Sequence, residues 1–158
     1  MIERAFGVSL TIPDNEAYTA LVTLQRLGIA CSEAMRADVY VFGVDDEAAA
    51  DALERLLPTI ATIFNPNKHR LRALRAPRPQ AGEVWISAAE AGPPADNLTV
   101  GGVLLPRART VWRATSWRLR DAQGADVAPA LLRRAVETLL CNPAFQRALY
   151  EDRMALGC

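Results

Sequence analysis

Residues 36–66 read RADVYVFGVDDEAAADALERLLPTIATIFNP, and this stretch contains the clearest strand and the clearest helix of the chain. Residues 38–44 are rich in β-branched and aromatic side chains, which favours a strand. The acidic run at residues 45–47 suits the first turn of a helix, where backbone N–H groups lack partners. Pro58 predicts a kink because it has no N–H group, and the helix is expected to end at residues 65–67. The apolar positions at helical spacing are Leu53, Leu56, Leu57 and Ile60.

The residues on either side of this stretch extend the alternation of strand and helix. Residues 5–12 predict a strand, and residues 14–15 can cap a helix that ends at Gly28. Residues 69–75 alternate between arginine and apolar side chains, as an edge strand does, and residues 30–35 leave room for one arm of a hairpin. The resulting order is the β-α-β-β-α-β pattern of ferredoxin-like folds. We therefore expect an α+β fold in which helices cover an antiparallel sheet.

The second half of the chain repeats the first at an offset of 77 residues, the distance from Asn65 to Asn142. Each of these asparagines precedes a proline at the end of an apolar helical stretch. At the same offset, the Arg-Ala pair that begins at Arg36 falls on the pair that begins at Arg113. Because one offset aligns two strands and a helix without a gap, we interpret the chain as an internal duplication.

Two prolines and a glycine at residues 77–82 indicate a linker or turn. We place the boundary of the duplication there. The sequence thus predicts two ferredoxin-like repeats with antiparallel sheets, residues 1–76 and residues 83–158.

The second repeat is expected to be a divergent copy. Residues 84–88 and 110–120 predict strands, and Asp126 is placed to cap a helix whose first turn contains Pro129. The counterpart of the first helix, residues 92–105, contains two prolines and two adjacent glycines. Such a composition favours a loop over a full helix.

Composition and charge limit the function classes. Lys plus Arg and Asp plus Glu each number 18, so the net charge is zero, which disfavours a nucleic-acid binder. No apolar run reaches the roughly 18 residues of a membrane span, and residues 1–4 do not resemble a signal peptide. Cys31, Cys141 and Cys158 are widely spaced, which predicts unpaired thiols. We expect a cytoplasmic globular protein that binds neither membrane nor nucleic acid.

A basic and amide-rich segment is the best candidate for a ligand or partner site. Its arginines and lysine can hold phosphate or carboxylate groups, although charges on an edge strand can also serve to prevent pairing between edges. The chain has one histidine and no G-x-S-x-G motif, so no catalytic residue, metal site or cofactor is predicted. The candidate residues are Asn65, Asn67, Lys68, His69, Arg70 and Arg72, with the repeat counterparts Arg36, Arg113 and Asn142.

The repeated motifs resemble those of PurS proteins, the small subunit of phosphoribosylformylglycinamidine synthase. The matching positions are Arg26-Leu27-Gly28, Arg36-Ala37, Asn65-Pro66, Arg113-Ala114 and Leu140-Cys141-Asn142-Pro143. The resemblance covers both halves, about seventy residues each, and implies a tandem PurS fused into one chain. It also implies a non-catalytic scaffold that bridges glutaminase and formylglycinamidine ribonucleotide synthetase subunits in purine biosynthesis, and that forms homo-oligomers.

A second hypothesis from a different class is a small-molecule-binding regulatory domain. Ferredoxin-like pairs can hold ligands between their sheets or at their seams. In that case the segment at residues 65–72 would contain the ligand site. The fold alone does not choose between these hypotheses, because it serves many functions.

Overall fold

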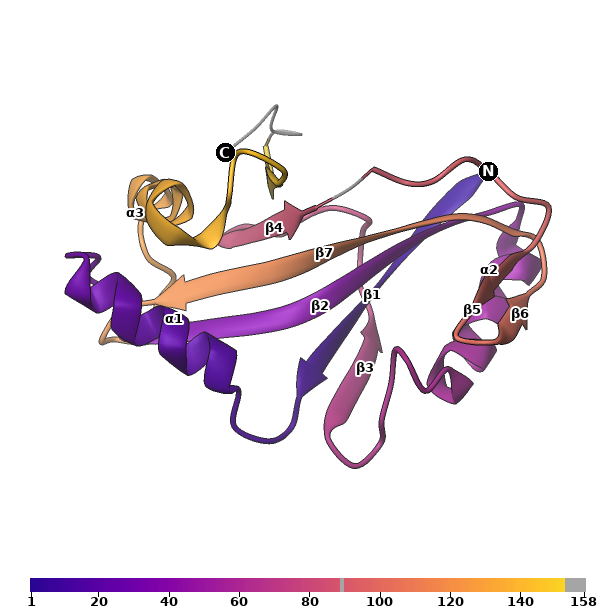
Figure 1. Ribbon diagram of the computed structural model, residues 1–158, viewed down its shortest axis with the longest axis horizontal. Helices are drawn as coiled ribbons and strands as arrows, with labels where there is room; N and C mark the ends of the chain where they lie inside the picture. Colours follow the sequence, from indigo (N-terminus) through magenta and orange to yellow (C-terminus); the bar gives the residue numbers. More distant parts are fainter. Residues whose placement is uncertain (89, 153–158) are drawn as a thin grey trace. The chain divides into compact units, whose positions relative to one another are not determined.

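The computed structural model of the chain describes residues 1–88 and 90–152 and has an α+β architecture (Figure 1). The strands are β1 Ile2–Leu10, β2 Glu33–Val44, β3 His69–Ala73, β4 Glu83–Ser87, β5 Leu98–Val100, β6 Val103–Leu105, β7 Ala108–Arg120 and β8 Arg147–Tyr150. The helices are α1 Asn15–Arg26, α2 Glu47–Leu56 and α3 Pro129–Ala135, with a 3₁₀ turn η1 Leu57–Thr59 and a π-helical turn η2 Val136–Leu140.

The stretch at residues 36–66 begins in β2 and continues through α2 and η1. Asp46 is the N-cap of α2, and its side chain accepts a hydrogen bond from the Ala49 N–H at 2.9 Å. This bond satisfies one of the N–H groups that a helix start leaves open. Pro58 lies in η1, directly after α2. The predicted cap and the interruption at the proline are therefore confirmed, whereas the predicted helix end at residues 65–67 is wrong, because η1 ends at Thr59.

The chain divides into two compact units, and each unit is assembled from three separate segments. Unit 1 consists of residues 1–12, 38–77 and 90–113. Unit 2 consists of residues 13–37 together with the described parts of 78–89 and 114–158. Strands β2 and β7 contribute residues to both units.

Each unit contains strands in the same order. In unit 1 the neighbours follow as β3-β1-β2-β7, and in unit 2 they follow as β8-β4-β7-β2. An offset of 77 residues, taken from Asn65 to Asn142, relates β1 to β4, β2 to β7 and β3 to β8. The two orders are thus the same arrangement of corresponding strands.

One segment of each half belongs to the unit formed mainly by the other half. Residues 13–37, which contain α1, belong to unit 2. Their counterparts at the same offset, residues 90–113, belong to unit 1 and contain the hairpin of β5 and β6. We call residues 13–37 and 90–113 the exchanged segments.

The core of each unit includes side chains from its exchanged segment. In unit 1, β1, β2, α2 and η1 pack with Leu105 and Ala108, and α2 contacts β6. In unit 2, β4, β7, α3 and η2 pack with Ala17, Leu24 and Ile29, and α1 contacts η2. The exchanged segments are therefore structural parts of the units that receive them.

Several sequence predictions need correction. Residues 30–35 do not form the separate arm of a hairpin, because β2 runs without a break from residue 33 to residue 44. Asp126 does not cap α3, whose N-cap is Ala128 without a side-chain bond; Asp126 accepts from Arg118 Nη1 at 2.8 Å instead. The tandem boundary at residues 77–82 remains a prediction.

Candidate functional site

Three residues of the predicted site form the turn that precedes β3. The Asn65 N–H donates to His69 Nδ1 at 2.9 Å, and the Asn67 N–H donates to Asn65 Oδ1 at 2.9 Å. The Asn65 carbonyl accepts from the His69 N–H at 2.8 Å. The side chains of Asn65 and His69 therefore hold the backbone of the turn in place, and Asn67 takes part through its backbone N–H.

The turn before β8 has the same hydrogen bonds at corresponding positions. The Asn142 N–H donates to Gln146 Oε1 at 2.7 Å, and the Ala144 N–H donates to Asn142 Oδ1 at 3.0 Å. The Asn142 carbonyl accepts from the Gln146 N–H at 2.8 Å. Gln146 thus occupies the position that His69 has in the first turn. Asn142, predicted as a repeat counterpart, has the same turn-forming role as Asn65.

Exposed cations follow the first turn along the edge strand β3. Lys68, Arg70, Arg72 and Arg75 are all exposed, and we call them the basic strip. In unit 1, β3 pairs with β1 on one side and is the last strand in the order. No acidic residue occurs in the sequence at positions 55–82. The strip is therefore a concentration of positive charge in a protein of zero net charge.

The basic strip differs from most other arginines of the described chain in its ion pairing. No strip residue lies within 4.0 Å of a carboxylate among residues 1–88 and 90–152. The arginines that do form such pairs are Arg4, Arg36, Arg107, Arg109, Arg118, Arg120 and Arg133.

The remaining predicted residues form contacts with residues outside the basic strip. Arg36, in unit 2, donates to both carboxylate oxygens of Asp14 and pairs with Glu16. Arg113, in unit 1, places its guanidinium carbon 4.9 Å from the centre of the Tyr40 ring, which is a cation–π contact. Arg36 and Asn142 belong to unit 2, whereas the strip belongs to unit 1. The predicted residues are thus divided between the two units.

The acidic run at residues 45–47 is paired with arginines. Arg109 donates from Nε and Nη2 to the two oxygens of Asp45 at 2.7 and 2.8 Å. This bidentate bond lowers the pKa of the Asp45 carboxyl below its usual range. Asp46 pairs with Arg107, and Glu47 accepts from Arg4. Among the described residues, no three His, Cys, Asp or Glu side chains are grouped to hold a metal ion.

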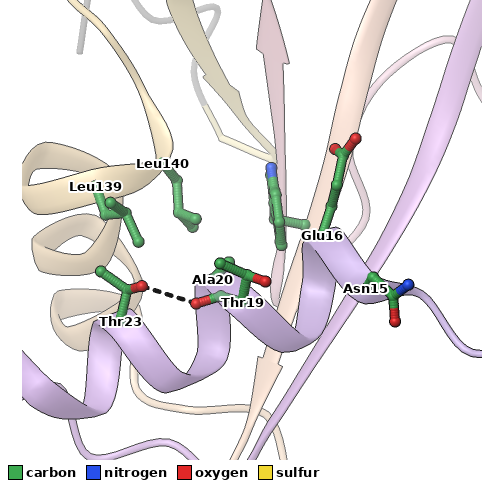
Figure 2. Close-up of a pocket in the computed structure, with 8 residues that line it drawn as sticks. Asn15, Glu16, Thr19, Ala20, Thr23, Leu139 and Leu140 are labelled. Atoms are coloured by element: carbon green, nitrogen blue, oxygen red, sulfur yellow. Dashed lines mark hydrogen bonds between the residues drawn. The ribbon is translucent and has the colours of Figure 1, made fainter.

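A groove in unit 2 was not predicted from the sequence. It has a volume of about 430 Å³ and lies along α1, where Glu16, Thr19, Ala20 and Thr23 line it together with Asn15. Leu139 and Leu140 of η2 and Trp117 of β7 complete the lining. Figure 2 shows the two leucines facing Ala20 and Thr23 across the open space. Thr23 Oγ1 donates to the Thr19 carbonyl at 2.8 Å, which directs that hydroxyl back onto its own helix.

The cysteines agree only in part with the prediction of unpaired thiols. Cys31 is free and buried in the core of unit 2, and burial raises the pKa of its thiol. Cys141 is disulfide-bonded, which contradicts the prediction for this residue. Cys158 lies outside the described residues.

Comparisons with known proteins assign no family. No protein-family model matches the chain, and no curated protein matches it. The resemblance to PurS therefore remains a prediction that rests on the motifs quoted above. In the described part of the chain, no helix has the length and apolar character to cross a membrane.

Proposed function

We propose that the chain is a non-catalytic accessory protein that joins other proteins, as its resemblance to PurS implies. The observation that carries the proposal is the basic strip, whose four cations are exposed and have no carboxylate within 4.0 Å in the described chain. Charges left unpaired on one surface are suited to an acidic partner, because complementary charge speeds encounter and fixes register. A cytoplasmic location and self-association belong to the same proposal.

The backbone of β3 supports the choice of this surface. The Thr11 N–H donates to the Lys68 carbonyl at 2.8 Å, and the Leu74 N–H donates to the Ala5 carbonyl at 2.8 Å. Hydrogen-bonded and non-hydrogen-bonded pairs alternate in an antiparallel ladder. The backbone groups of Leu71 therefore face away from β1, at the open edge of the strand. An acidic extended segment can add to such an edge and meet the strip at the same time.

The arrangement of the units supports the resemblance to PurS. Corresponding strands follow in the same order in both units, and corresponding segments are exchanged between the two halves. A tandem copy of a dimer-forming protein is expected to have this arrangement. The turns at Asn65 and Asn142, with equivalent hydrogen bonds, agree with it.

The experiment is a reconstitution with the glutaminase and formylglycinamidine ribonucleotide synthetase subunits of the same source organism. We expect sedimentation velocity to detect a complex whose affinity falls as ionic strength rises. The double variant R70E/R72E should weaken it about tenfold or more, because attraction becomes repulsion at two positions. Its thermal unfolding should match that of the wild type.

The matched control is R26E/R134E, which reverses two other exposed arginines that have no carboxylate within 4.0 Å in the described chain. It should leave the complex unchanged. Absence of any complex with the wild-type protein would refute the purine-pathway scaffold. A complex that both double variants weaken equally would refute the basic strip as its contact surface.

A second function, the binding of a small molecule, is favoured by the groove in unit 2. Its volume of about 430 Å³ lies within the range of roughly 300–1,000 Å³ that is usual for ligand pockets. This groove is distinct from the segment at residues 65–72 that was predicted to hold such a ligand.

A further inference from the structure

The groove of unit 2 has an apolar floor, and the charged side chain that lines it is the carboxylate of Glu16. Trp117 is 9% exposed and belongs to the core, so its indole provides a fixed aromatic surface. Leu139 is 38% exposed although it is a large apolar side chain. The groove is therefore suited to an apolar body about the size of a ring or a short branched chain.

The π-helical turn contributes to the shape of the groove. Leu139 and Leu140 both belong to η2, which directly follows α3. A π-helical turn is uncommon and is frequently found at functional sites. On the opposite wall, Thr19, Ala20 and Thr23 have small side chains that leave the space open.

Glu16 is the charged side chain among the residues that line the groove in the described structure. Its Oε2 accepts from Arg36 Nη1, and the same arginine also donates to Asp14. One guanidinium thus serves two carboxylates, which leaves an excess of one negative charge beside the groove. A cation is the complementary ligand group.

We propose that this groove binds a primary amine that carries an apolar ring or short chain. The ammonium group donates to the Glu16 carboxylate, and the apolar part packs on Trp117 and Leu139. The proposal does not depend on the scaffold function, and its test uses no partner protein.

The experiment is an NMR titration of the labelled protein with three matched compounds: 2-phenylethylamine, 2-phenylethanol and 3-phenylpropionate. The amine should shift the amide signals of α1 and η2 and the Trp117 indole N–H signal, which the variant W117F assigns. We expect the amine to bind about two- to fivefold more tightly than the alcohol, the range of one exposed ion pair. The carboxylate should bind more weakly than the alcohol.

Two variants separate the contribution of the Glu16 charge to binding from that of the groove volume. Glu16→Gln should remove the preference for the amine over the alcohol, whereas Glu33→Gln, at an exposed glutamate of unit 2 outside the lining, should retain it. Thr19→Leu should weaken both compounds by filling the groove, and its exposed position on α1 keeps the protein folded. Unfolding curves of every variant accompany the titration.

Any one of several results would overturn the proposal. The first is an equal affinity for all three compounds, or shifts that lie outside α1, η2 and Trp117. The second is an amine preference that survives Glu16→Gln. The third is an unchanged affinity in folded Thr19→Leu. An absence of any shift at millimolar amine would also refute it.

Discussion

Units 1 and 2 share one strand order but receive different exchanged segments. In unit 1 the segment is the β5–β6 hairpin, whose Leu105 is fully buried against the core that contains α2. In unit 2 it is α1, whose Thr19 and Thr23 line an open groove. Both exchanged segments contribute a fully buried leucine, Leu105 in unit 1 and Leu24 in unit 2, and α1 in addition contributes small side chains that line the groove.

The difference separates the two candidate functions. Unit 1 has the basic strip on its edge strand, where partner binding requires only exposed charge. Unit 2 has the groove, whose apolar lining and Glu16 carboxylate suit a small ligand.

Truncation of a buried leucine in either exchanged segment should destabilise the protein strongly. Leu105 of the hairpin and Leu24 of α1 are both 0% exposed. We expect Leu105→Ala and Leu24→Ala each to lower the free energy of unfolding by about 2–5 kcal/mol, because each leaves a cavity. Urea unfolding at equilibrium measures both values. A loss below about 0.5 kcal/mol for Leu24→Ala, as at a surface position, would mean that α1 does not belong to the core of unit 2.

The two glycines of the hairpin turn should differ in their tolerance of a side chain. Gly101 and Gly102 both have positive φ angles, 54° and 79°. A Cβ at Gly101 would lie 2.4 Å from Thr62 Oγ1, whereas a Cβ at Gly102 would meet no atom within 4 Å. Gly101→Ala should therefore destabilise by about 2–3 kcal/mol and Gly102→Ala by about 1 kcal/mol. Equal losses in urea unfolding would show that the hairpin does not pack against Thr62.

Helix capping distinguishes α2 of unit 1 from α3 of unit 2. Asp46 caps α2, whereas the N-cap of α3 is Ala128 without a side-chain bond. Asp46→Ala should reduce stability by about 1 kcal/mol, and Asp46→Asn should retain most of it because asparagine also caps. Ala128→Asp should add about 0.5 kcal/mol. Thermal unfolding of the three variants checks the order, and a stabilising Asp46→Ala would contradict it.

The ion pair between Asp45 and Arg109 in unit 1 should give a small stability that depends on pH. The pair lowers the pKa of Asp45 in the folded state. Its contribution is therefore fully present above the unfolded pKa of about 3.9 and is lost as the pH falls through the lower folded value. Asp45→Asn should have a lower Tm than the wild type at pH 7, and the difference should shrink below about pH 4. A difference that stays constant down to acidic pH would refute the assignment.

Local signals in the sequence were sufficient for much of the fold. Residues 14–15 and 45–47 were predicted to start helices. Within them, Asp14 and Asp46 accept hydrogen bonds from N–H groups three residues later. Pro58 was predicted to interrupt a helix, and β3 was predicted as an edge strand; the structure confirms both. These features depend on residues close in sequence, so pattern and capping chemistry are enough to find them.

Features that depend on distant residues were missed. Asp126 has the chemistry of a cap, but Arg118 lies within 2.8 Å of it and forms an ion pair instead. The groove requires Trp117 and Leu139 to lie opposite α1, and no spacing in the sequence predicts that arrangement. The small residues Thr19, Ala20 and Thr23 on one helix were a signal for open space. Whether small side chains leave a groove depends on the residues packed opposite them, which the sequence does not identify.

Methyl–methyl NOE spectroscopy can show whether the two halves of the chain exchange segments. Contacts between α1 and η2, and between α2 and β6, predict NOEs from Leu21 methyls to those of Leu140 and from Val103 methyls to those of Leu53. The assignment uses one leucine or valine variant for each signal. Observation of both sets would establish that each unit receives its segment from the other half. NOEs from α1 methyls to α2 methyls, with none to η2, would show that α1 is not exchanged into unit 2.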